Sequence, residues 1–333
     1  MRKRRSCAGV WGYKAKRPKD LPKTPPLTPQ ALVPPAALPA PKRHAEPGRA
    51  IALMICATAL LAGTTLIAKA LGTDRLGPAL HPLQVSFGRF LFAWVVIAAT
   101  VAALRPQFSK PDIKTHVIRT FCGWAGVTLM FAAAATIPLS DATAISFLNP
   151  VLAMVLAIPL LGERVGRWRW LAAAIALTGA MILIRPGSAV MQTGALLALG
   201  AACALGLELI FMKRLSGRER PAQILLLNNS IGLVIAACAV LWVWQPPTGA
   251  QWAGMIALGC VMACAQVFFI NALARADASF ITPFSYLTLV FATVYDGVIF
   301  GVIPTAVSLL GALTIICGAG LLAWREAVHR RNK

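Results

Sequence analysis

Three ionisable residues lie inside long apolar stretches, where a charge exposed to lipid is costly. Arg89 is close to the middle of its stretch, and Asp296 and Glu208 are nearer the ends of theirs. A guanidinium group matches the fork geometry of a carboxylate or a phosphate. A carboxylate in such a place is a candidate to carry a proton across the membrane. The pattern predicts binding of an anionic group at Arg89 and proton coupling at Asp296 or Glu208.

Each of these residues also has a structural interpretation, which the sequence leaves open. Arg89 could be tied to helix carbonyls or to a buried acid. Asp296 could pair with Lys69, and Glu208 with the cations that follow it in the sequence. Asp141, before another apolar stretch, is interpreted as a helix N-cap rather than a proton site.

Neutral polar residues occur at a similar depth and could line a substrate pathway. Trp124 and Tyr286 could stack on a planar substrate or only pack. Asn149 precedes Pro150, whose missing N–H frees a carbonyl one turn back, and a freed carbonyl can line a cavity. Gln266 is a further candidate, and hydrogen bonding between helices is the alternative role for these polar groups.

Composition indicates what positions these residues. Of 333 residues, 58% are hydrophobic and 13% are charged, and the mean hydropathy is +0.71. This excludes a soluble protein, a largely disordered chain and a disulfide-stapled secreted fold. Continuous apolar runs argue against a membrane β-barrel. Seven of the eight cysteines lie within these runs, where cysteine acts as a small hydrophobe, and no metal set is complete. The predicted fold class is an all-α polytopic membrane protein.

Ten apolar segments follow one another, each about as long as a helix that crosses a bilayer. They cover residues 50–71, 80–104, 116–137, 142–161, 167–185, 190–212, 222–244, 251–273, 278–300 and 304–324.

Lys and Arg residues are concentrated in every second connection between these segments. With a cytoplasmic N-terminus, 28 of them fall in the cytoplasmic tails and connections and 2 in the outer connections. Without residues 1–49 the numbers are 16 and 2. This count groups Arg119, near the start of the third segment, with the inner connection between the second and third segments. The positive-inside rule therefore predicts that both termini are cytoplasmic.

An internal repeat is visible. Ser140–Thr143 resembles Ala276–Ser279, and Leu161–Glu163 matches Phe300–Val302 further along. Each copy would have five helices, and an odd number makes the second copy enter from the opposite side. Inverted repeats of this kind are typical of alternating-access transporters.

The chain resembles the EamA family of the drug/metabolite transporter superfamily. The residues that carry the resemblance are Pro138–Thr143, Leu148–Pro150, Leu160–Arg164, Trp168 and Gly179.

The resemblance covers about residues 50–325, as repeats 50–186 and 190–325. The second copy departs from the family pattern, with Leu289 where a proline is expected and Val302 where an acid is expected. The family implies a transporter of amino acids, metabolites, nucleoside-like cofactors or toxic compounds, and a bacterial inner membrane.

The two ends of the chain differ from the apolar region. Residues 1–49 are basic and rich in proline, which predicts a disordered cytoplasmic tail, and residues 326–333 form a second basic tail. A solvated tail, residues upstream of the native start and a lipid-headgroup contact remain alternatives for the first.

No phosphate-binding loop, HExxH or GxSxG motif occurs, so we expect neither an enzyme nor a cofactor. The predicted partners are a small-molecule substrate, the lipid bilayer and a coupling proton, without nucleic acid. The predicted function is secondary transport of a small organic metabolite, with export favoured. The alternative is a non-transporting scaffold or accessory subunit that binds a partner through the basic tail.

Overall fold

The computed structural model describes residues 47–161, 166–184, 193–215, 219–275 and 282–331, all within one compact unit, His44–Lys333. Every regular element in these ranges is a helix. They are α1 (Pro47–Leu71), α2 (Pro82–Leu104), α3 (Ile113–Thr136), α4 (Leu139–Ser146), α5 (Asn149–Leu161), α6 (Arg167–Ile184), α7 (Thr193–Leu215), α8 (Pro221–Val240), α9 (Gly249–Arg275), the 3₁₀ turn η1 (Thr282–Tyr286), α11 (Leu287–Tyr295), the π-helical turn η2 (Asp296–Phe300) and α12 (Ala306–Arg331).

Seven of these segments are long and apolar enough to cross a membrane. They are 48–71, 82–104, 113–136, 139–160, 193–212, 221–240 and 249–272. Three shorter apolar helices, at 170–183, 284–300 and 306–318, coincide with the other three predicted segments. The all-helical, polytopic membrane class is therefore confirmed. The predicted tail up to residue 46 lies outside the described residues.

Two helices extend past the predicted ends of their apolar segments. α3 begins at Ile113 because the Asp112 carboxylate caps it, accepting a hydrogen bond from the backbone N–H of Thr115 at 3.3 Å. Arg119, grouped with the preceding connection in the count of cations, thus lies in the second turn of α3. α12 runs on to Arg331, because the Arg, Glu and Ala residues beyond its apolar part have high helix propensity.

The predicted fourth segment is not one continuous helix. α4 ends at Ser146 and α5 begins at Asn149, and Phe147 and Leu148 lie between them. The cause is Pro150, which has no N–H to donate to the carbonyl oxygen of Ser146 and whose ring would clash with that carbonyl in a continuous helix. Asp141 is the third residue of α4, and Pro138 is the N-cap, so the N-cap prediction for Asp141 is wrong. The Asp141 carboxylate instead accepts a hydrogen bond from Ser308 Oγ at 3.1 Å.

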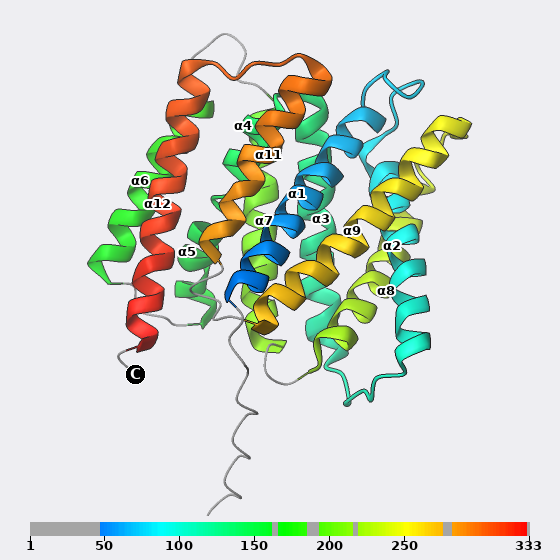
Figure 1. The fold of residues 1–333 in the computed structure, drawn as a ribbon, viewed down its shortest axis with the longest axis horizontal. Coiled ribbons are helices and arrows are strands. Elements are labelled where there is room, and N and C mark those ends of the chain that lie inside the picture. Colours follow the sequence, from blue (N-terminus) through cyan, green and yellow to red (C-terminus); the bar gives the residue numbers. More distant parts are fainter. Residues whose placement is uncertain (1–46, 162–165, 185–192, 216–218, 276–281, 332–333) are drawn as a thin grey trace, which may run out of the picture. The chain divides into compact units, whose positions relative to one another are not determined.

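The predicted ninth segment is also interrupted. It consists of η1, α11 and η2 in succession, so a 3₁₀ turn and a π-helical turn flank one short α-helix. The two interrupted segments are neighbours, since α4 packs against α11. They stand next to each other in the middle of Figure 1.

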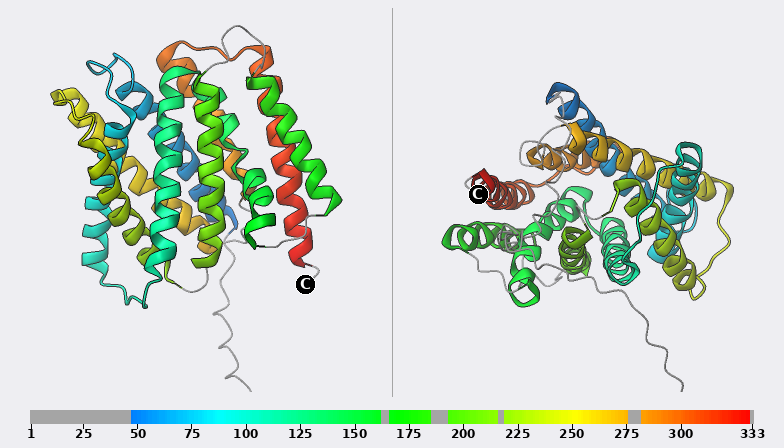
Figure 2. Two further views of the ribbon diagram at one scale, coloured as in Figure 1. Left: turned by 180° about the vertical axis from the view of Figure 1, so that it is seen from behind. Right: turned by 90° about the horizontal axis from the view of Figure 1, so that it is seen from below.

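The helices of the first half pack against those of the second. α3 packs against α7, and α1 packs against α9. α2 lies against both α8 and α9, and α6 pairs with α12 at one edge of the bundle (Figures 1 and 2). The first and second halves of the chain are therefore interleaved.

Small residues allow α6 and α12 to approach closely. A Cβ atom on Gly179 would lie 2.7 Å from the carbonyl oxygen of Gly311. A Cβ atom on Gly318 would lie 2.5 Å from the backbone nitrogen of Ala176. Such contacts drive helix association in membranes, where lipid removes most of the hydrophobic driving force.

Candidate functional site

A hydrogen bond sets the register between α2 and α3. Thr128 Oγ1 donates to Ser86 Oγ at 2.9 Å in the buried interface. Arg89 lies three residues beyond Ser86, and Trp124 lies four residues before Thr128. Because the two helices are antiparallel, both steps lead one turn in the same direction. Arg89 and Trp124 are therefore at the same level of the bundle.

Arg89 is deeply buried, and its guanidinium group is only partly satisfied. The side chain is 4% exposed, and its Cζ lies 4.4 Å from the centre of the Phe90 ring. Nη1 has no hydrogen-bond partner, and neither has the buried Trp124 Nε1. Unpaired donors at this depth are costly, so two groups at one level are available to a polar ligand.

A second buried arginine, Arg119, pairs with Glu208. Arg119 Nη2 donates to Glu208 Oε1 at 2.9 Å, which joins α3 to α7. The Arg119 side chain is 4% exposed, and its Nε and Nη1 have no partner. The Glu208 carboxylate also interacts electrostatically with Arg89. The predicted pairing of Glu208 with a cation is thus found, but its partner is Arg119.

Gly123 gives Glu208 its place beside α3. A Cβ atom at this position would lie 2.9 Å from the carboxyl carbon of Glu208. Any larger residue would therefore displace the carboxylate. Since Gly123 and Trp124 are adjacent, Glu208 is level with Trp124 and Arg89. α2, α3 and α7 together place Arg89, Arg119, Trp124 and Glu208 in one polar site.

Asp296 lies elsewhere, in a second buried cluster. Lys69 Nζ and Asp296 Oδ1 are 2.5 Å apart, and Asp296 Oδ2 accepts a hydrogen bond from the backbone N–H of Leu139 at 2.7 Å. This cluster joins the end of α1, the turn η2 and the start of α4. The pairing of Lys69 with Asp296 is the structural alternative that the sequence left open.

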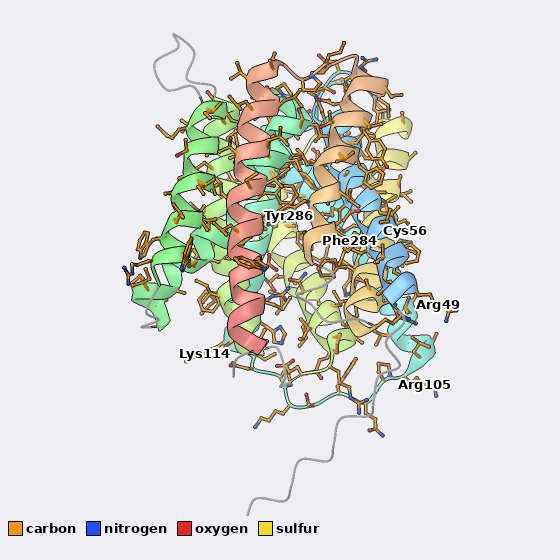
Figure 3. All side chains as sticks on the ribbon, turned by 60° about the vertical axis from the view of Figure 1, so that its left-hand side comes forward. Arg49, Cys56, Arg105, Lys114, Phe284 and Tyr286 are labelled. Atoms are coloured by element: carbon orange, nitrogen blue, oxygen red, sulfur yellow. The ribbon has the colours of Figure 1, made fainter. Side chains whose placement is uncertain are left out.

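Tyr286 lies at a contact between the two interrupted segments. Its ring meets that of Phe147 edge to face, with centroids 5.2 Å apart and an angle of 76° between the planes. Tyr286 ends η1, and Phe147 lies in the break between α4 and α5. Figure 3 shows Tyr286 within the bundle, away from the end that carries Arg49, Arg105 and Lys114.

Asn149 and Gln266 are not placed next to Arg89. The Asn149 carbonyl oxygen packs on Gly206, which lies on the opposite face of α7 from Glu208. Gly88 packs on Met255 and Gly259 packs on Ala93, so α9 runs alongside α2 in the same direction. From this contact Gln266 is seven residues further on, and Arg89 is four residues back, which separates them by about 16 Å along the helices. Gln266 Oε1 is buried without a partner.

Two buried ionisable residues of α3, Arg119 and His116, were not among the candidates predicted from the sequence. Arg119 was counted with the cations of the connection before its segment, and His116 is the first residue of that segment. His116 is fully buried, and its Nε2 lies 2.9 Å from Glu219 Oε2. The Asp112 cap at the start of α3 was the signal that could have placed both residues deeper inside the helix.

A pocket of about 250 Å³ lies between α4, α11 and α12. Its walls are mainly apolar, with the Asp141 carboxylate and the Ser308 hydroxyl among the polar groups. None of the seven predicted site residues lines it. No group of three potential metal ligands occurs among the described residues.

The model of the EamA-like transporter family matches this chain twice, at residues 48–185 and 192–324. The chain belongs to the EamA-like transporter family. It is a transporter of the drug/metabolite transporter superfamily and a membrane protein with several spans. The functional class predicted from the sequence is confirmed.

Characterised relatives are similar over most of their length. A riboflavin transporter of Rhizobium johnstonii is 34% identical over 66% of this chain and 72% of its own. An S-adenosylmethionine uptake transporter of Rickettsia prowazekii is 25% identical over 78% of this chain and 88% of its own. A solved crystal structure, 22% identical, matches with a TM-score of 0.56 over 82% of this chain and 97% of its own, which shows the shared fold.

Proposed function

We propose that this transporter moves a small organic metabolite across a bacterial inner membrane by alternating access, with export favoured over uptake. The substrate class is amino-acid-like, nucleoside-like or cofactor-like. Two relatives are named for riboflavin and for S-adenosylmethionine, which supports this class. The observation that carries the proposal is the deeply buried Arg89, whose Nη1 has no partner in a membrane-spanning helix.

We propose an architecture of two inverted five-helix repeats, residues 50–186 and 190–325. The two matches of the family model support it. The most extensive helix contacts also support it, because each of them has a counterpart. The α3–α7 contact corresponds to α9–α1, α5–α7 corresponds to α11–α1, and α2–α8 and α6–α12 correspond to themselves. Ser146–Leu148 and Ser285–Leu287 repeat the pattern serine, aromatic, leucine at the two interruptions.

Both termini are proposed to face the cytoplasm. Arg49, Arg105 and Lys114 lie at one end of the bundle (Figure 3), and α12 ends at the same end as α1 begins (Figure 1). Cations at one end of membrane-spanning helices favour the cytoplasmic side. In this orientation Arg119 and Glu208 lie toward the cytoplasm, and Lys69 and Asp296 lie toward the outside.

Of the two acids, Glu208 is the better candidate to carry a coupling proton. Asp296 is 1% exposed, and both of its oxygens are engaged by Lys69 and by the Leu139 N–H. The Glu208 side chain is 21% exposed, against 2% for that of Asp296, so it is the less enclosed of the two acids. Rocking of the two halves would then expose the polar site to each side in turn.

The test is untargeted mass spectrometry of medium and cytosol from cells that produce wild type, Arg89→Leu or no transporter. Arg220→Leu, at the exposed N-cap of α8, is the matched control. We expect a compound raised in the medium for wild type and the control only, and a compound depleted from the medium would indicate uptake. Membrane-inserted Arg89→Leu that transports at the wild-type rate would overturn the role of Arg89. The proposed function would be overturned if the metabolites of cells that produce the wild type equalled those of cells without the transporter.

A further inference from the structure

The charges of the polar site do not balance. Two buried guanidinium groups, on Arg89 and Arg119, share the single carboxylate of Glu208. The nearby Glu219 is already engaged, because it accepts hydrogen bonds from Gln223 Nε2 and the Asp112 N–H and pairs with His116. A buried arginine is stabilised by an anion, so this site has the charge to hold one more.

The hydrogen-bond donors are also in excess. Arg119 uses Nη2 for Glu208 and keeps Nε and Nη1 unpaired. Arg89 Nη1 is unpaired as well. Both side chains are 4% exposed, so these donors lack bulk water. Nε and the Nη atoms of arginine form a planar fork that matches the two oxygens of a carboxylate or a phosphate.

We infer that Arg119 and Arg89 form an oxyanion-binding site and that Glu208 is the counter-ion that the incoming oxyanion replaces. The ligand carries a carboxylate or a phosphate, and in the transporter this group belongs to the substrate, a step that rests on the proposed function. Glu208 suits the exchange because it is more exposed than either arginine, at 21% against 4%. Its departure would uncover the donors that it now covers.

The experiment measures oxyanion binding to the purified full chain in a maltoside detergent, which carries neither carboxylate nor phosphate. The probes are inorganic phosphate and acetate, titrated at constant ionic strength against chloride, with thermal stabilisation as the signal. Stabilisation by phosphate alone would assign a phosphate site, and stabilisation by acetate would assign a carboxylate site. The inference would be overturned if neither phosphate nor acetate stabilised the wild type or Glu208→Gln.

Two substitutions test the roles of the individual groups. Glu208→Gln removes the competing carboxylate, so we expect at least tenfold tighter oxyanion binding. Arg119→Lys keeps a cation for Glu208 but removes the fork, so we expect at least tenfold weaker binding with normal folding. Glu219→Gln, which alters a buried acid outside the site, should stay within twofold of wild type. Unchanged binding in Glu208→Gln or in Arg119→Lys would overturn the inference.

A second route displaces Glu208 without removing its charge. Gly123→Ala places a methyl group 2.9 Å from the Glu208 carboxyl carbon and should strengthen oxyanion binding. This variant takes the place of Glu208→Gln if that variant fails to fold. Weaker binding in Gly123→Ala would count against the exchange. The two proposals also fail separately. Oxyanion binding by a protein that moves no metabolite overturns only the proposed function, and transport without oxyanion binding overturns only this site.

Discussion

The Lys69 ammonium and the Asp296 carboxylate lie 2.5 Å apart in a buried position, although 227 residues separate them in the sequence. The second carboxylate oxygen accepts the backbone N–H of Leu139, which is the first residue of α4. One acid thus joins α1, the end of the interrupted ninth segment and the start of the interrupted fourth segment. Asp296 thereby ties together both segments whose helices are broken.

Breaking this pair should be strongly destabilising. Asp296→Ala leaves an ammonium group and a backbone N–H buried without partners, and we expect a loss of about 3–5 kcal/mol in the free energy of unfolding. The double variant Lys69→Met with Asp296→Asn removes both charges, and the amide oxygen can still accept from Leu139. It should recover most of that loss. Reversible unfolding in mixed micelles measures all three proteins.

The double variant also separates a structural role from a proton-carrying one. If Asp296 is structural, the double variant transports with the same dependence on the proton gradient as wild type. Loss of that dependence in a stable double variant would show that Asp296 carries the coupling proton. A double variant as unstable as Asp296→Ala would contradict the ion-pair argument.

The sequence predicts the apolar segments well because hydropathy is a local property. Each of the ten predicted segments contains an apolar helix within the described residues, and most ends agree within a few residues. The break at Phe147 was not predicted, although Pro150 supplied its cause. A proline in a membrane helix is often accommodated, and only packing decides whether the helix kinks or stops.

The members of the polar site were predicted unevenly for a different reason. Arg89 and Glu208 stand out because each is a lone charge in an apolar run. Arg119 lies close to the cations of a connection, so composition alone assigned it there. Its partner is 89 residues away on another helix, and pairing at that separation depends on the register of α3 and α7, which hydropathy does not encode.

Adding one methyl group to Gly179 should weaken the packing of α6 against α12. The new Cβ would lie 2.7 Å from both the Gly311 carbonyl oxygen and the Ile315 nitrogen, and these backbone atoms cannot rotate away. Overpacking of this kind costs about 1–3 kcal/mol, which exceeds the gain of about 1 kcal/mol from replacing a helical glycine. We expect Gly179→Ala to lower the thermal unfolding midpoint of the purified protein.

Gly320→Ala is the matched control for this prediction. Gly320 also lies in α12, but a Cβ atom there meets no heavy atom within 4 Å. Its substitution should leave the midpoint unchanged or raise it. Equal midpoints for the two variants would mean that α6 and α12 do not pack as closely as the structure shows.

The contact between Phe147 and Tyr286 should be measurable as a coupling energy between the two interrupted segments. Edge-to-face ring pairs contribute about 0.5–1.5 kcal/mol beyond the area that they bury. In a double-mutant cycle of Phe147→Leu and Tyr286→Leu, we therefore expect the double variant to lose less stability than the sum of the singles. Tyr286→Phe keeps the ring and should behave as wild type in this cycle.

The same cycle on transport rates tests whether this contact changes during transport. Phe291 and Tyr295, which are four residues apart with ring centroids at 6.2 Å, form a matched pair within one helix. If the two halves rock against each other, rings that meet across interrupted segments must separate or slide, whereas a pair within one helix moves as one body. We expect coupling in transport rate for Phe147 with Tyr286 and additive effects for Phe291 with Tyr295. Additive effects for both pairs would indicate that the contact between the interrupted segments stays fixed throughout the cycle.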